Sequence, residues 1–254
     1  MARKVLWVVD GDMAGLLDRA HYVRAQAVCV RTTNGWLKGA IQAIKGQGFD
    51  VYAWRWPAVR PTKPPPAHYY ADDEAQYVLE LIAEGLDGYI ADPESDGDRG
   101  VNDWNDAQLA NLANRFCDTI KIAGRQKNPH FLFGLTSGCN YPTLMNNIPW
   151  SVFVAHSDGV YPQIYWAPNI RHRHTPEDAY NIGMTSWRTI VPASMNVCPI
   201  IGEIATVKAD EIRRFGTIMT NNSISEVHFY TCAPGISGDN WDALRNLGQV
   251  PVVA

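Results

Sequence analysis

The sequence predicts an α/β protein with one domain, residues 1–254, folded as a single (β/α)₈ TIM barrel. Eight short apolar segments alternate with stretches of helical periodicity, and no linker divides the chain. The apolar segments are rich in Val, Ile, Tyr and Phe, as is typical of parallel strands buried on both faces. Eight such units in about 250 residues match the size of this barrel. A doubly wound open sheet is the alternative, but the segment DGDMAG after the first strand lacks the GxGxxG phosphate loop.

Each predicted strand is a short apolar run that stops where polar or turn residues begin. The runs lie at residues 5–12, 27–33, 50–56, 87–92, 130–137, 158–166, 199–206 and 226–232. Pro57 ends the third run, because proline cannot donate a hydrogen bond to a neighbouring strand. The Pro-rich segment 57–70 follows, and a loop of this length in a compact domain is often a binding loop.

The predicted helices lie between the strands and follow from apolar spacing and capping residues. They cover residues 35–48, 71–85, 106–124, part of 141–157, 175–191, 208–222 and 237–248. In the first of these, Leu37, Ile41 and Ile44 fall on one face of a helix. The helix at 71–85 begins with acidic residues, which suit the positive end of the helix dipole, and closes at Gly85.

The composition argues against several classes of protein. The net charge is −4 with a pI of about 6.0 and no basic stripe, so we expect no nucleic-acid partner. No apolar run reaches the roughly 20 residues of a membrane span, and Asp10 interrupts the first run, so we expect a soluble protein without a signal peptide. The five cysteines are scattered, and neither CxxC nor HExxH occurs. We therefore expect buried free thiols, no metal, no cofactor and a monomer.

Polar and aromatic residues gather at the carboxyl ends of the predicted strands, where TIM barrels place their active sites. Carboxylates beside aromatic rings are typical of carbohydrate sites, because rings stack on sugar faces and carboxylates act on the glycosidic bond. The sequence therefore predicts a glycan partner. The expected catalytic residues are Glu94, Asp92 and Glu203, and the expected glycan-binding residues are Asp10, Arg31, Trp54, Trp56, Gln163, Tyr165, Trp166 and Tyr230.

Alternation along the strands is consistent with this grouping, because side chains two residues apart share one face of a strand. Asp92 and Glu94 share a face with Ile90, and Gln163 shares a face with Tyr165. Asp10 in the same way follows Val8, and Glu203 follows Ile201. Alternation alone leaves open which face of each strand is turned into the barrel.

The segment DGYIADPE, residues 87–94, resembles the DGxDxDxE motif on the fourth strand of the chitinase-type glycoside hydrolases of family eighteen. This resemblance implies that Glu94 is the general acid and that Asp92 orients the acetamido group of the substrate, which acts as the nucleophile. Ile90 stands where the motif has its middle Asp. The segment YPQIYW is similar to the sixth-strand segment that carries an essential Tyr in this family, which implies the same role for Tyr165.

A second resemblance is to the muramidase-type lysozymes of family twenty-five, through Asp10, the segment VRTT at 30–33, Asp92 and Glu94. The segments DGYI…E and PQ-Y also resemble segments of bacteriophage-type proteins, which implies action on the cell wall. Many retaining glycosidase barrels instead pair a Glu after the fourth strand with one after the seventh. In that arrangement Glu94 would be the acid/base and Glu203 the nucleophile, with carboxyls about 5 Å apart.

Other interpretations stay open for the same residues. A non-catalytic carbohydrate-binding barrel and a metal-dependent hydrolase are the alternatives to a glycosidase, since Asp10, Asp12, Asp92 and Glu94 carry oxygen ligands that suit Mg²⁺ or Ca²⁺. The tryptophans and Tyr165 could also be core residues, and Asp10 could pair with an arginine. Asp12 is expected to be a cap or a loop acid, and His228 is expected to be a core histidine.

Overall fold

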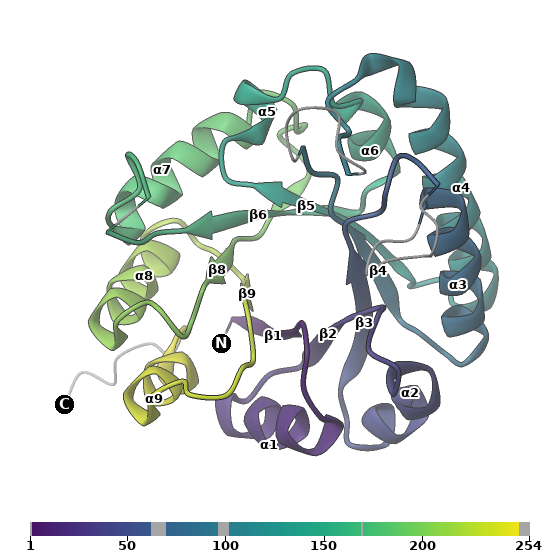
Figure 1. Cartoon of the computed structure of the whole chain (residues 1–254). Helices are drawn as coiled ribbons and strands as arrows, with labels where there is room; N and C mark the ends of the chain where they lie inside the picture. Colours follow the sequence, from purple (N-terminus) through teal and green to yellow (C-terminus); the bar gives the residue numbers. More distant parts are fainter. Residues whose placement is uncertain (1, 62–69, 96–101, 169, 249–254) are drawn as a thin grey trace.

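The computed structural model describes residues 2–61, 70–95, 102–168 and 170–248, which form a closed barrel surrounded by helices (Figure 1). The parallel strands of the barrel are β1 (Arg3–Val8), β2 (Ala27–Arg31), β3 (Asp50–Arg55), β4 (Gly88–Ala91), β5 (Leu132–Gly138), β6 (Gly159–Tyr165), β8 (Ile200–Gly202) and β9 (Glu226–Phe229). Each strand pairs with two neighbours, and the β5–β6 pairing joins the ends of the sheet. The predicted TIM barrel is confirmed, and the open sheet is excluded.

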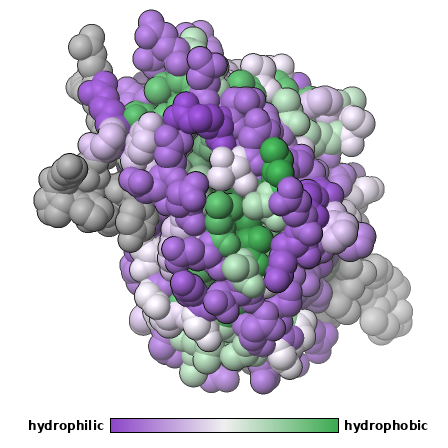
Figure 2. Space-filling view, turned by 90° about the vertical axis from the view of Figure 1, so that its right-hand side faces the viewer, coloured by the Kyte–Doolittle hydropathy of each residue, from purple (hydrophilic) through white to green (hydrophobic). Residues whose placement is uncertain are grey.

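The outer layer consists of helices that follow the strands in the chain (Figure 1). They are α1 (Met13–Val23), α2 (Leu37–Gly46), α3 (Ala71–Ala83), the 3₁₀ helix η1 (Ala107–Leu109), α4 (Ala110–Lys127), α5 (Tyr141–Leu144), α6 (Trp150–His156), α7 (Pro176–Trp187), α8 (Ala209–Asn221) and α9 (Gly238–Asn246). Within the described ranges, no helix combines the length and the apolarity that crossing a bilayer requires. Figure 2 shows the side of the molecule on which α3 and α4 lie, where hydrophilic residues surround a small hydrophobic area.

Two elements differ from the sequence prediction. The predicted elements do not include α1, although Asp12 begins it as expected by accepting a hydrogen bond from the Gly15 backbone at 2.7 Å. The short strand β7 (Asn196–Val197) is also new and pairs with β6 beside the barrel. Most predicted strands extend too far at their carboxyl ends, because those residues belong to loops. Residues 62–69 of the predicted binding loop lie outside the described residues.

The barrel separates its hydrophobic residues into an inner and an outer layer. Val5, Trp7, Cys29, Tyr52 and Ile90 are among the side chains packed inside the barrel. The intervening residues of each strand pack outward against the helices, as alternation along a strand requires. All five cysteines are free thiols, and four of them are buried, as expected for core cysteines, whereas Cys232 is half-buried.

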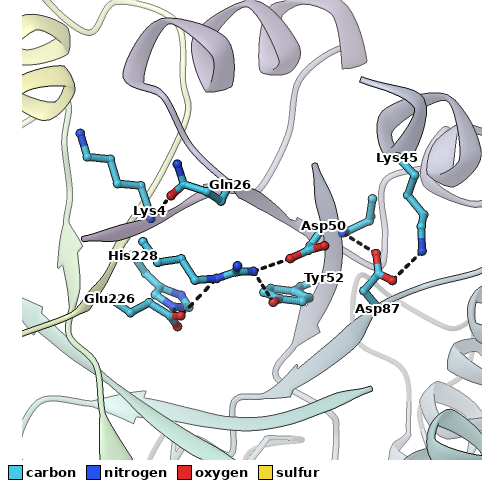
Figure 3. Close-up of polar contacts among 10 residues, drawn as sticks. Lys4, Gln26, Lys45, Asp50, Tyr52, Asp87, Glu226 and His228 are labelled. Carbon is cyan, nitrogen blue, oxygen red and sulfur yellow. Dashed lines mark hydrogen bonds and ion pairs between the residues drawn. The ribbon is translucent and has the colours of Figure 1, made fainter. Parts of the chain in front are cut away.

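Polar residues close the amino-terminal end of the barrel. The Arg3 guanidinium on β1 lies 2.6 Å from Asp50, donates to the Tyr52 hydroxyl at 2.7 Å and lies 3.2 Å from Glu226. Figure 3 shows Asp50, Tyr52 and Glu226 turned toward the space between β1, β3 and β9. This network joins three strands beneath the inner hydrophobic layer.

Gly88 on β4 offers a test of how tightly the barrel packs. A Cβ at this position would lie 2.8 Å from the carbonyl oxygen of Leu132 and 3.0 Å from the Tyr52 ring. We expect Gly88→Ala to lower the free energy of unfolding by about 1–3 kcal/mol, because backbone atoms must shift. Gly39 is exposed on α2, and a Cβ there would meet nothing within 4 Å. Gly39→Ala should therefore raise the free energy of unfolding by about 0.5–1 kcal/mol. Urea denaturation measures both, and equal effects would contradict the tight contact.

Candidate active site

A pocket of about 260 Å³ lies at the carboxyl ends of the barrel strands. Its lining combines three carboxylates, one amide and five aromatic rings: Trp7, Trp54, Trp56, Asp92, Glu94, Gln163, Tyr165, Glu203 and Tyr230. All of these except Trp7 were predicted from the strand ends. The structure thus brings together the three expected catalytic residues and five of the eight expected glycan-binding residues.

Asp92 is the buried carboxyl of this pocket, with 2% of its surface exposed. It follows β4, and its backbone N–H donates to the Arg55 carbonyl of β3 at 2.9 Å, which continues the ladder by one residue. Its side chain shares the inward face with Ile90, which packs inside the barrel. Gln163 of β6 donates its amide N–H groups toward both carboxyl oxygens, at 3.1 Å each. Asp92 is therefore held in one orientation by two strands.

The environment of Asp92 favours its protonated form. Burial is the main cause of a pKa well above the usual value, and the nearby charge of Glu94 adds to it, while the bond from Gln163 acts in the opposite direction. Two carboxyl groups in one water-poor site resist being ionised together. The pair can therefore hold and move a proton, which a hydrolytic site requires.

Glu94 and Glu203 complete the acidic part of the pocket from different strand ends. Glu94 is half-buried, and the carbonyl of the preceding Pro93 accepts a hydrogen bond from the Ser137 hydroxyl at 2.6 Å. Glu203 is exposed and directly follows β8. Burial, together with the charges of Asp92, Glu94 and Glu203, raises the pKa of Tyr165 and of Tyr230. Both phenols consequently stay protonated at neutral pH and can donate hydrogen bonds.

Aromatic rings form the walls of the pocket. Tyr165 and Tyr230 stack with ring centroids 5.5 Å apart and an angle of 19° between their planes. Trp54 lies 5.1 Å from Trp7 on one side and 5.1 Å from Trp56 on the other. Flat rings beside acids and an amide can take up the face of a sugar while the polar groups contact its hydroxyls.

Asp92 and Gln163 follow the alternation of their strands, but Glu203 does not. Ile201, two residues before Glu203, packs in the outer layer, so continued alternation would turn Glu203 away from the pocket. The strand ends at Gly202, however, and beyond it the rule no longer applies. Gly202 has no room for a side chain, since a Cβ would lie 2.6 Å from the Tyr230 carbonyl oxygen. Gly202 therefore lies directly against the backbone of Tyr230, and Glu203, the next residue, lines the pocket.

Three expected glycan-binding residues do not line the pocket. The Asp10 side chain is 80% exposed and lies 2.6 Å from the Arg31 guanidinium, which is 5.5 Å from the centre of the Trp56 ring. Asp10 therefore pairs with an arginine at the rim. Trp166 is 1% exposed and stacks on Phe215 of α8 at 5.8 Å in the outer layer, so it does not line the pocket. Trp166 follows Tyr165 directly, and adjacent residues face opposite sides of a strand.

The four acids proposed as metal ligands are not gathered at one site. Asp10 and Asp12 line a separate cavity of about 180 Å³ beside Arg19 and Trp241, whereas Asp92 and Glu94 line the central pocket. Within the described ranges, no group of three or more His, Cys, Asp or Glu side chains is placed to hold a metal ion. The geometry therefore offers no support for the metal-dependent alternative.

Trp7 is the lining residue that sequence reasoning missed. It is the last residue but one of β1, whereas the predicted strand ran on to Asp12, and only 1% of its surface is exposed. Trp7 shares one face of the strand with Val5 and Val9, but nothing in the sequence told whether that face is turned into the barrel. Because β1 ends at Val8 and not at Asp12, Trp7 lies near the carboxyl end of the strand, where the pocket is.

Comparison with known proteins identifies the fold. No protein-family model matches the sequence, and no curated protein sequence does. Among solved structures, a chitinase from Chromobacterium violaceum is similar over 98% of this chain and 100% of its own, with 12% identity and a TM-score of 0.64. A glycoside hydrolase family 18 N-acetylglucosaminidase from Paenibacillus barengoltzii matches over 97% and 99%, with 11% identity and a TM-score of 0.66. The spore cortex-lytic enzyme of Bacillus megaterium matches over 97% and 74%, with 7% identity and a TM-score of 0.57. The chain thus has the barrel fold of these hydrolases.

The raised pKa of Asp92 predicts how stability depends on pH. In the unfolded chain Asp92 ionises at about pH 3.9, whereas the folded protein resists its ionisation, so the charged carboxylate costs stability at pH 7. We expect Asp92→Asn to raise the free energy of unfolding at pH 7 by about 1 kcal/mol or more. This gain should shrink as the pH falls through the raised folded pKa and vanish below about pH 4, where both states are protonated. Urea denaturation of both proteins across this pH range measures the gain. A gain of Asp92→Asn over wild type that is smaller at pH 7 than at pH 4 would contradict the prediction.

Proposed function

We propose that this protein is a retaining glycoside hydrolase that cleaves a β-linked, N-acetylated glycan of the peptidoglycan or chitin type. The observation that carries the proposal is the pair Asp92 and Glu94, two residues apart at the end of β4, in one pocket with aromatic walls. One member of the pair is buried and resists ionisation, and the other is half-buried and open to a ligand. In glycosidases, two neighbouring carboxyl groups take different roles, one as the acid and one as the stabilising group, because their environments give them different pKa values.

In this proposal the acetamido N–H of the bound substrate donates to Asp92, and the proton that the pair holds passes from Asp92 to Glu94. Glu94 is then the general acid that protonates the leaving glycosidic oxygen. The acetamido oxygen of the substrate attacks the anomeric carbon as the bond to the leaving group breaks. Asp92 accepts the acetamido N–H and stabilises the positive charge that develops, while Gln163 keeps the carboxyl of Asp92 in place. Glu94, now ionised, then takes a proton from the water that opens the cyclic intermediate. Proton and charge are balanced over the two steps without a cofactor.

The aromatic side chains hold the sugar in this scheme. Trp56 is half-buried and offers a ring face, Trp7 and Trp54 form the largely buried aromatic lining next to it, and the protonated phenols of Tyr165 and Tyr230 donate hydrogen bonds to the sugar or its acetamido carbonyl. Support for a glycan partner comes also from the fold, since the chitinase and the cortex-lytic enzyme named above share the barrel. Arg31 and Asp10, paired at the rim beside Trp56, are placed to contact a longer glycan outside the pocket.

Removal of the acid tests the proposal directly. We expect Glu94→Gln to lower hydrolysis of chitin oligosaccharides or of purified peptidoglycan by at least about 10³-fold, because the leaving oxygen loses its proton donor. Glu80→Gln is the matched control, since Glu80 is exposed on α3, pairs with Lys38 and lies outside the pocket. Product release is followed by mass spectrometry. Full activity in Glu94→Gln would refute the assignment, and glycan binding by wild type without product would indicate a carbohydrate-binding barrel instead.

A second experiment identifies the nucleophile, because Glu203 lines the same pocket and could form a glycosyl-enzyme intermediate with Glu94 as acid/base. If the acetamido group is the nucleophile, a matched substrate without its N-acetyl group should resist cleavage at least about 100-fold, and Glu203→Gln should keep measurable turnover. Cleavage of both substrates with total loss of activity in Glu203→Gln would assign the role to Glu203. Rates of the two aryl glycosides with each variant make the comparison.

A further inference from the structure

The floor of the pocket is connected to the polar base of the barrel through one buried histidine. Trp7, which lines the pocket, donates its indole N–H to Nδ1 of His228 at 2.9 Å. We propose that His228 is a positioning residue that fixes the Trp7 indole as the floor of the sugar pocket, through a neutral imidazole held from below by Glu226. The catalytic part of this proposal rests on the proposed function, and its structural part does not.

The hydrogen bonds of His228 define one tautomer. Because Nδ1 accepts from Trp7, it carries no proton, and the proton of the neutral ring must lie on Nε2. Nε2 lies 2.9 Å from the carboxylate of Glu226 and donates to it. His228 has no exposed surface, and its ring packs against the ring of Tyr161 of β6 with the ring centres 4.3 Å apart.

Glu226 is itself immobilised by charge. Arg3 lies 3.2 Å from its carboxylate and is held in turn by Asp50 and Tyr52. Figure 3 shows Glu226 and His228 side by side, with Asp50 and Tyr52 across the end of the barrel. Burial disfavours the ionised carboxyl, but the interactions of Glu226 with His228 and then with Arg3 outweigh this effect and lower the pKa of Glu226. A carboxylate fixed in this way selects the Nε2–H tautomer of the histidine.

The charge state of His228 fits the same role. Burial lowers the pKa of the imidazole, although the hydrogen bond and charge of Glu226 oppose this effect, so the ring is neutral at neutral pH. A protonated ring would carry N–H groups at both nitrogens and could no longer accept from Trp7. The indole N–H would then be buried without a partner, which favours rotation of Trp7.

Rotation of Trp7 would reach the sugar-binding surface. Its ring lies 5.1 Å from Trp54 and 6.3 Å from Tyr230, and both residues line the pocket. Tyr230 in turn stacks on Tyr165. The orientation of the Trp7 indole therefore determines how the aromatic side chains of the pocket pack against one another. An aromatic ring binds the face of a sugar only when its plane is held in place.

The structural part is tested on the wild-type protein by nuclear magnetic resonance with ¹⁵N-labelled histidine and tryptophan. We expect His228 at pH 7 to be neutral with its proton on Nε2, and a scalar coupling across the hydrogen bond between the indole nitrogen of Trp7 and Nδ1 of His228. A proton on Nδ1, or a doubly protonated ring, would overturn the proposal. This measurement requires neither a substrate nor a variant.

Two substitutions separate positioning from packing. His228→Asn keeps an acceptor near the place of Nδ1, whereas His228→Gln keeps a donor near Nε2 and loses the acceptor for Trp7. We expect His228→Gln to shift the indole N–H resonance of Trp7 and to raise KM about tenfold with kcat changed less than about threefold, and His228→Asn to stay within about threefold of wild type in both. Equal KM values in the two variants, or an unshifted resonance in His228→Gln, would overturn the proposal. If wild type cleaves no glycan, the proposed function fails, and the resonance of Trp7 alone decides the role of His228.

Discussion

Closure of the parallel sheet gives every strand two buried faces, and alternation between them decides which side chains meet in the pocket. Residues on the inner face of β1, β3, β4 and β6 supply Trp7, Trp54, Asp92 and Gln163, while their sequence neighbours pack beneath the helices. The contrast between Tyr165, in the pocket, and Trp166, stacked on Phe215, shows how sharply this constraint divides adjacent aromatic residues.

The interior of the barrel is polar at both ends and apolar between them. At the base, Arg3 binds three partners from β3 and β9, so a half-buried cation is balanced by carboxylates and a phenol. At the mouth, the hydrogen-bond partner of the Asp92 carboxyl among the described residues is the neutral amide of Gln163. The polar cluster at the base therefore stabilises charged side chains, whereas the cluster at the mouth favours a carboxyl that can hold and release a proton.

Ile90 has a physical consequence in this arrangement. It occupies the inner layer directly beneath Asp92, packed among Trp54, Tyr161 and other apolar side chains. An isoleucine there removes water and charge from below Asp92, and burial is the main reason that the pKa of Asp92 is raised. Where the chitinase-type motif has an acid, this chain thus relies on an apolar contact and on Gln163 to set the properties of the same carboxyl.

By itself the sequence determined the barrel, because eight apolar runs separated by helical stretches leave few ways to bury every strand on both faces. It also determined most of the pocket, since parallel strands in a barrel end on one rim and the polar residues that end them must meet there. The tertiary structure alone decided which face of each strand is inside, and so excluded Trp166 and admitted Trp7. It alone placed Glu203, through the approach of Gly202 to Tyr230, and joined Trp7 to His228 across more than two hundred residues of chain. Such contacts depend on stagger and closure, which local patterns do not encode.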